Sequence, residues 1–164
     1  MPSVSFDQLP PDARLWIFAA ERRLSDTEIT RVLGEVDAFI GQWTAHAASL
    51  TTARDLRYNQ FIFVAVDERA AGASGCSVDA LVRRMKALQD ELGVELVNHA
   101  PVLYRDSSGI TRVSRDQFVD LTGSGVVTRQ TVVFDNTLTT VGAVREGRWE
   151  VPAGESWHGQ AFFT

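Results

Sequence analysis

One short segment of the chain combines residue types that hold anions with a residue that can form a reactive thiolate. Residues 72–79 read Gly-Ala-Ser-Gly-Cys-Ser-Val-Asp. They follow the apolar run 61–67 and precede apolar residues at helical spacing, so we expect them to join a strand to a helix. Glycine lets the backbone approach a ligand closely, and a helix N-terminus offers free amides and a partial positive charge. The residues predicted to bind a small anionic ligand are Gly72, Ser74, Gly75 and Ser77.

The same segment contains the only cysteine of the chain, Cys76. A thiol beside the positive end of a helix has a lowered pKa and becomes a nucleophile. Such an enzyme also needs a base. His46 follows the first predicted helix and His99 ends a predicted strand, so either could be the base, although both are distant from Cys76 in sequence. A third interpretation is purely structural, because a tight turn needs small residues and a free cysteine packs as a small apolar side chain.

Two classes of site are excluded by inspection. A P-loop needs a lysine directly after its second glycine to reach the outer phosphates, whereas the only lysine here, Lys86, lies inside the second predicted helix. Three histidines and one cysteine also lack the spacing of a structural zinc site. We therefore predict no P-loop ATPase activity, no metal and no cofactor.

Length and composition indicate one domain over residues 1–164, with 45% hydrophobic and 23% charged residues. A net charge of −5 disfavours a nucleic-acid partner. The longest apolar run has the length of a strand, and the first residues do not resemble a leader. A single cysteine is typical of a reducing compartment. We expect a cytoplasmic protein without a membrane partner, and the sequence leaves a homo-oligomer open.

The elements expected to position the segment form a core over residues 12–100. Residues 25–28 read Ser-Asp-Thr-Glu, a capping box that opens a helix with an apolar stripe. A second helix runs from residue 78 to residue 92, before a glycine that is typical of a helix end. Strands are expected at 14–20, 50–56, 61–67 and 94–97. The order β-α-β-β-α-β predicts an α+β fold with a ferredoxin-like core.

Residues 101–164 are expected to form a β-rich C-terminal extension with one short helix. A capping box at residues 114–117 opens this helix, which runs through Leu121. The predicted strands are 102–104, 110–113, 131–134, 138–144 and 148–151.

Several motifs recur in the same order in one protein family. They are Trp-Thr-Ala-His at 43–46, Tyr-Asn-Gln-Phe at 58–61, the segment 72–79, Phe-Asp-Asn at 134–136, Trp-Glu-Val-Pro at 149–152 and Ser-Trp-His at 156–158. Over nearly its whole length the chain resembles this family of uncharacterised bacterial proteins, whose members are often labelled ABC transporter ATPases. The resemblance implies no catalytic residues, and the missing P-loop lysine speaks against the activity in that label. A shorter resemblance, over residues 109–133, is to GYF-type adaptor modules and would favour peptide binding.

The sequence therefore favours a cytosolic domain that binds a small anion at the start of the second helix. One alternative is a thiol-dependent enzyme with Cys76 as the nucleophile. The other is a protein–protein interaction module without catalysis.

Overall fold

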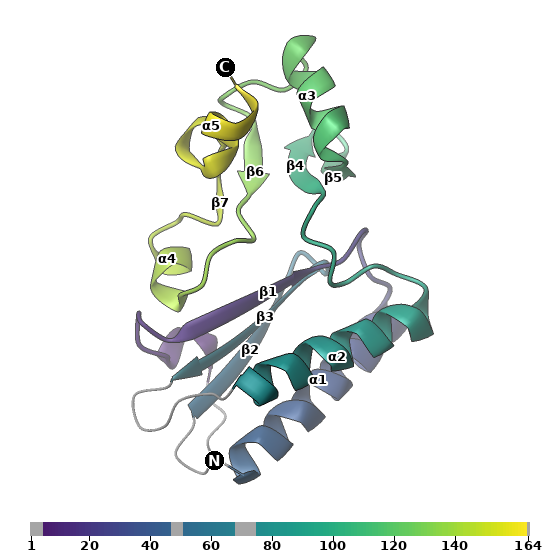
Figure 1. The fold of residues 1–164 in the computed structure, drawn as a ribbon, viewed down its shortest axis with the longest axis vertical. Helices are drawn as coiled ribbons and strands as arrows, with labels where there is room; N and C mark the ends of the chain where they lie inside the picture. The colour runs from purple at the N-terminus through teal and green to yellow at the C-terminus, as the bar shows by residue number, and fades with distance from the viewer. Residues whose placement is uncertain (1–4, 47–50, 68–74, 164) are drawn as a thin grey trace. The chain divides into compact units, whose positions relative to one another are not determined.

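A computed structural model describes residues 5–46, 51–67 and 75–163, with the backbone alone described for residues 44–46 and 75–77. The chain divides into two compact units, each built around an antiparallel sheet (Figure 1). The N-terminal unit is formed by Met1–Val97 with Thr139–Gly142, and the C-terminal unit by Asn98–Leu138 with Ala143–Thr164. Helices accompany both sheets, which confirms the predicted α+β class.

The sheet of the N-terminal unit contains β1 (Arg14–Ala19), β2 (Thr51–Arg57) and β3 (Phe61–Asp67), in the order β1-β3-β2. The central strand β3 is buried from Phe61 to Val66, as its continuous apolar sequence predicts. The turn between β2 and β3 places Tyr58 and Asn59 at φ 55° and 54°. The Gln60 amide donates to Arg57 O at 3.1 Å across these two residues, and Arg57 pairs with Phe61, so residues 58–60 form the connection between the strands.

Helices α1 (Asp26–His46) and α2 (Gly75–Leu92) cover one face of this sheet (Figure 1). The predicted capping box is confirmed, because the Ser25 amide donates to Glu28 Oε1 at 2.8 Å and the Glu28 amide donates to Ser25 Oγ at 3.2 Å. The shared core consists of alternate residues of β3 and the apolar stripes of both helices. Its members include Val32, Val36, Ile40, Trp43, Ile62, Val64, Val66, Leu81, Met85 and Leu88.

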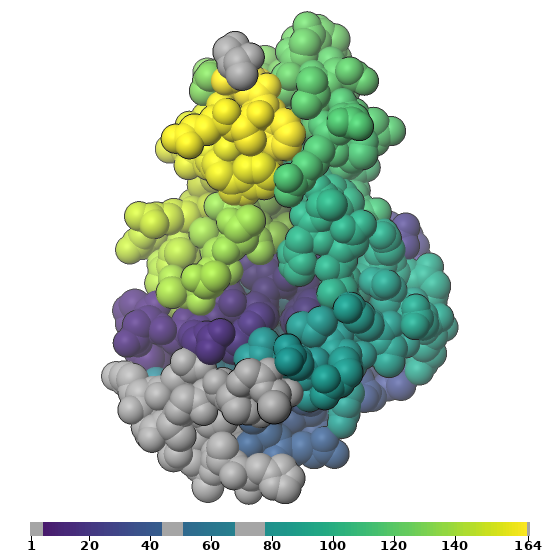
Figure 2. All heavy atoms as spheres, viewed as in Figure 1, coloured from purple at the N-terminus to yellow at the C-terminus, as the bar shows by residue number. Residues whose placement is uncertain are grey.

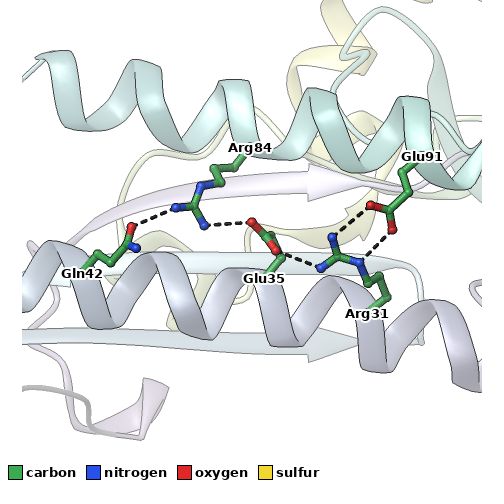
Figure 3. Close-up of polar contacts among 5 residues, drawn as sticks. All are labelled: Arg31, Glu35, Gln42, Arg84 and Glu91. Atoms are coloured by element: carbon green, nitrogen blue, oxygen red, sulfur yellow. Dashed lines mark hydrogen bonds and ion pairs between the residues drawn. The ribbon is translucent and has the colours of Figure 1, made fainter.

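A chain of polar contacts joins α1 to α2 (Figure 3). Arg31 donates to both carboxylate oxygens of Glu91, at 2.7 and 2.9 Å, and to Glu35 at 2.8 Å. Arg84 donates to the other oxygen of Glu35 and to Gln42, both at 2.8 Å. Because residues later in α1 meet residues earlier in α2, the two helices are antiparallel. Solvent screens partly exposed pairs of this kind, so they define the register of the helices more than their stability.

The strand predicted at residues 94–97 is wrong. Val94 and Leu96 are buried, as the alternating pattern requires. However, Gln89 Oε1 accepts the amides of Leu96 and Val97, at 2.9 and 3.2 Å. These amides are no longer available to a strand partner. The ferredoxin-like topology is therefore not confirmed, since the described sheet contains β1, β2 and β3 only.

In a ferredoxin-like sheet, the predicted strand 94–97 would pair with β1. A segment from much later in the chain occupies part of that position. The Leu15 amide donates to Thr139 O at 2.9 Å, and the Val141 amide donates to Ala13 O at 3.0 Å. Between these bonds, Arg14 and Thr140 form an isolated antiparallel bridge. The N-terminal unit is thus completed by residues that follow most of the C-terminal unit in sequence.

The sheet of the C-terminal unit has the order β5-β4-β6-β7. Its strands are β4 (Val102–Asp106), β5 (Gly109–Val113), β6 (Val132–Phe134) and β7 (Glu150–Pro152). The predicted hairpin of β4 and β5 is confirmed. The capping box that opens α3 (Arg115–Gly123) is confirmed as well, because Ser114 and Gln117 exchange amide-to-side-chain bonds at 2.8 and 3.1 Å.

The strand predicted at residues 138–144 is wrong, because the chain turns into α4 (Val141–Arg145). The first amides of a helix have no acceptor within it, and here Ala13 O and Pro11 O accept those of Val141 and Gly142, at 3.0 and 2.7 Å. A Cβ at Gly142 would lie 2.7 Å from Pro11 O, so this approach requires glycine.

The prediction of one short helix in the extension is also wrong. A 3₁₀ turn, η2 (Ala153–Glu155), leads into α5 (Trp157–Phe162), which Ser156 caps. Phe118 of α3 is fully buried against this end of the chain, with ring centroids 5.0 Å from Phe162 and 6.2 Å from His158. A further 3₁₀ turn, η1 (Phe6–Gln8), lies in the N-terminal unit. Within the described residues, we find no helix whose length and apolarity would let it cross a membrane.

Candidate functional site

The residues predicted to bind an anion are only partly described. Gly72 and Ser74 lie outside the described residues. Gly75, Cys76 and Ser77 form the first turn of α2, with the backbone alone described, so the helix begins earlier than the predicted start at residue 78. That turn contains no acidic side chain to offset the partial charge of its amides. The anion site stays a prediction.

The antiparallel helices bring the two predicted catalytic residues to the same end of the N-terminal unit. His46 is the last residue of α1 and Cys76 the second residue of α2, although neither side chain is described. Asn59 lies at the opposite end, since its carbonyl accepts the amide of Leu24, just before α1, at 2.8 Å. The topology required for a pair of Cys76 and His46 is therefore present, and the pair itself stays a prediction.

A pocket with fully described walls lies in the C-terminal unit. Its volume is about 690 Å³, within the range of small-molecule sites. Its walls come from the residues around β6, from the segment before β7, and from η2 and α5. The lining residues are Arg129, Asp135, Leu138, Arg148, Gly154, Glu155, Ser156, Trp157, Gly159 and Gln160.

Backbone contacts fix the wall formed by η2 and α5. The Gly154 amide donates to Arg129 O at 2.8 Å, which joins η2 to the segment before β6. Gly159 lies so close to η2 that a Cβ would be 2.8 Å from Ala153 O. Ser156 caps α5 by accepting the His158 amide at 3.1 Å.

Asp135 is the most deeply buried charged residue of the pocket, with 9% of its surface exposed. Its amide donates to Trp149 O at 2.7 Å, which holds the backbone directly after β6. Its Oδ1 accepts from the amide of Thr137 at 3.0 Å and from the Thr137 hydroxyl at 2.5 Å. Its Oδ2 makes no hydrogen bond with the part of the chain that the structure describes. One oxygen of a buried carboxylate is thus left for another donor.

His158 lies behind the pocket wall, with 2% of its surface exposed and its ring stacked on Trp157 at 4.0 Å. Because Ser156 Oγ accepts the His158 amide, its own proton is free to go to His158 Nδ1, which lies 2.5 Å away. Burial lowers the pKa of His158 to about 4, against an opposing effect of Asp135 and with a smaller contribution from Arg115. The imidazole is therefore neutral at pH 7.

The contact of Ser156 with His158 at the edge of a pocket resembles part of a nucleophilic site. A general base works best with a pKa near the working pH. With a pKa of about 4, His158 is a weak base at neutral pH. The helix cap accounts for the bond from the His158 amide to Ser156 Oγ, and the contact of Ser156 Oγ with the ring nitrogen Nδ1 is a separate one.

Charged side chains surround the mouth of the pocket. Arg129, Arg148, Glu155 and Gln160 are exposed, and the space-filling view shows the α5 segment, in yellow, at the surface (Figure 2). Arg129 donates to Phe163 O at 2.9 Å and stacks over the Phe163 ring. Arg148 pairs with the exposed Glu146 at 3.1 Å. Guanidinium and carboxylate groups therefore line the same space.

None of these pocket residues was among the site residues predicted from the sequence. Ser156 and Trp157 stood out in the sequence as a Ser-Trp-His motif, and Asp135 as part of a Phe-Asp-Asn motif. Nothing in the sequence places these two motifs in one pocket, because they are far apart in the chain, with β7 and η2 between them. In the described ranges, no three His, Cys, Asp or Glu side chains are grouped so that they could hold a metal ion.

Comparison of the chain with protein-family models, curated proteins and solved structures gave no match.

Proposed function

We propose that this chain is a small-ligand binding domain whose ligand occupies the pocket of the C-terminal unit. The observation that carries the proposal is the composition of this pocket, which has a buried carboxylate, Asp135, on its wall and the guanidinium groups of Arg129 and Arg148 at its mouth. Ligand sites are concave and contain a few polar groups that converge on the ligand. Leu138 and Trp157 supply apolar surface to the same space.

The two arginines give this site the preference for anions that the sequence favoured at the start of α2. Guanidinium groups bind carboxylates and phosphates through paired hydrogen bonds. Arg129 and Arg148 each make one described polar contact, with Phe163 O and Glu146 respectively, so most of their five donors remain available. We therefore propose that the anion binds in this pocket and not at the start of α2.

The proposal is tested by following backbone amides with NMR while acetate or phosphate is added at constant ionic strength. We expect the shifts to concentrate at residues 154–160. The double variant Arg129→Gln/Arg148→Gln should lose them. The matched control Arg23→Gln, which removes an exposed arginine of the N-terminal unit, should keep them. Shifts confined to residues 75–77 would instead support the site predicted at α2, and no shift at either place would refute anion binding.

The remaining parts of the proposal rest on the sequence alone. They are membership of the bacterial family named above, a cytoplasmic location, no nucleic-acid partner and a homo-oligomer as an open option. The thiol enzyme and the interaction module stay as alternatives.

A further inference from the structure

We propose that the ligand of this pocket is a zwitterion, whose cationic nitrogen binds Asp135 and whose carboxylate binds the arginines at the mouth. This inference rests on the proposed function and specifies the chemical class of the ligand. It starts from the carboxylate of Asp135, whose Oδ1 accepts two hydrogen bonds and whose Oδ2 accepts none from the described residues.

A carboxylate that is nine-tenths buried is costly unless donors or a counter-charge compensate it. Two donors from Thr137 satisfy Oδ1 of Asp135. No donor from the described residues reaches Oδ2, and this atom is not one of their fully buried polar atoms without a partner, so it is accessible to solvent. His158 lies close enough to feel the carboxylate charge but is neutral at pH 7, so it provides no counter-charge. A cationic N–H donor in the pocket would complete the coordination of Asp135.

The mouth of the pocket has the opposite requirement. Arg129 and Arg148 are exposed and retain unused donors that suit a carboxylate. Gln160 can donate from its amide to the same group. A ligand with a carboxylate alone would leave Asp135 uncompensated and would bring a second negative charge toward it. A ligand with an ammonium group alone would leave the arginines unused.

Three matched probes separate these cases, namely dialanine, N-acetyl-dialanine and dialanine amide. The first carries both charges, the second only the carboxylate and the third only the ammonium group. Each is titrated against the full chain at pH 7, and dissociation constants are taken from the shifts of the amides at residues 154–160. We expect dialanine to bind roughly 10- to 100-fold more tightly than either capped probe, the range for one charged hydrogen bond.

The variant Asp135→Asn tests whether Asp135 is the residue that binds the ammonium group. An asparagine keeps an oxygen for Thr137 and removes the negative charge. The variant should bind dialanine only as tightly as it binds N-acetyl-dialanine. Its affinity for N-acetyl-dialanine should be at least that of the wild type. The matched control is Asp106→Asn, since Asp106 also accepts a nearby amide and hydroxyl but does not line the pocket. This control should change neither affinity.

Two outcomes overturn the zwitterion and leave the proposed function standing. In one, N-acetyl-dialanine binds the wild type as tightly as dialanine does. In the other, Asp135→Asn leaves the affinity for dialanine unchanged. The first needs no variant, so the test holds even if Asp135→Asn fails to fold. If neither the three probes nor acetate and phosphate shift residues 154–160, the pocket is not a site and the proposed function fails.

Discussion

Replacing His158 with phenylalanine should remove a pH dependence from the stability of the C-terminal unit. Burial lowers the pKa of His158 to about 4 in the folded chain, whereas an unfolded histidine has its ordinary value of 6.5. Between these values the unfolded chain binds a proton that the folded chain does not. Stability is therefore complete above pH 6.5 and falls as the pH is lowered toward 4, below which both states are protonated.

The size of the effect follows from the separation of the two pKa values. At 1.36 kcal/mol per pKa unit, the fall from 6.5 to about 4 corresponds to about 3 kcal/mol of unfolding free energy. The hydrogen bond from Arg22 lowers the pKa of Glu28 to about 2, so this carboxylate changes the stability only below about pH 4.5, and it does so in wild type and His158→Phe alike. Its contribution is present above its unfolded value of 4.5 and is lost below that pH. A phenylalanine ring at position 158 suits the aromatic contacts with Phe118 and Phe162.

The assay is urea unfolding at pH values between 4 and 7.5, followed by amide resonances of the C-terminal unit. The difference in unfolding free energy between wild type and His158→Phe should change by about 3 kcal/mol over this range. The control is Phe162→Leu, which removes another ring from the same aromatic cluster but no titrating group, and should lower the stability equally at every pH. An imidazole pKa of 6 or above by NMR, or equal pH slopes for wild type and His158→Phe, would refute the reasoning.

Three further predictions concern packing and the thiol. Gly159→Ala should destabilise the C-terminal unit by about 1–3 kcal/mol in urea unfolding, because the new Cβ meets Ala153 O at 2.8 Å. Its control Gly34→Ala, on α1 with nothing within 4 Å, should stabilise by about 0.5–1 kcal/mol, and equal effects would contradict the packing argument. Phe118→Ala should cost about 3–5 kcal/mol, since the ring is fully buried, and a loss below 1 kcal/mol would contradict that burial. If the thiol enzyme holds, iodoacetamide should label Cys76 faster than free cysteine at pH 7 and Cys76→Ser should abolish the labelling; labelling no faster than that of free cysteine would contradict it.

The parts of the fold that the sequence predicts depend on neighbours close in the chain. The start of α1 is specified by the exchange between Ser25 and Glu28, three residues apart. The hairpin of β2 and β3 depends on two turn residues, Tyr58 and Asn59. Local preference and packing agree at the start of α1 and at Asn59, which tolerates positive φ. Tyr58 at φ 55° goes against the usual preference of an aromatic residue, so its conformation was not predictable from the sequence.

The two wrong strands depend on partners that a local pattern does not contain. At residues 94–97 the alternation correctly predicts which side chains are buried, but the side chain of Gln89 binds the amides that a strand would use. At residues 138–144 the acceptors that start α4 are Ala13 O and Pro11 O, far away in sequence. Alternation predicted burial at residues 94–97 only, because the buried Val141 and Val144 are three residues apart, as on a helix. In neither segment were the hydrogen-bond partners predictable.

The candidate site was harder to predict than the fold. Asp135 stands in the sequence as one carboxylate among 21 acidic residues. Its importance comes from burial, from the two donors on Oδ1 and from the open Oδ2, which are properties of the folded chain. The sequence drew attention to small residues and a cysteine instead, because they form a continuous motif.

The edge of the N-terminal sheet at β1 can be completed only late in the synthesis of the chain. The amide of Leu15 and the carbonyl of Ala13 find their partners only when Thr139 and Val141 have been translated. At 5–20 residues per second, the wait between Val97 and Gly142 lasts about 2 to 9 s. During that interval the nascent chain exposes an unpaired strand edge, which is a template for pairing with another chain. A ribosome that stalls before residue 139 would leave this edge open, so we expect such fragments to aggregate.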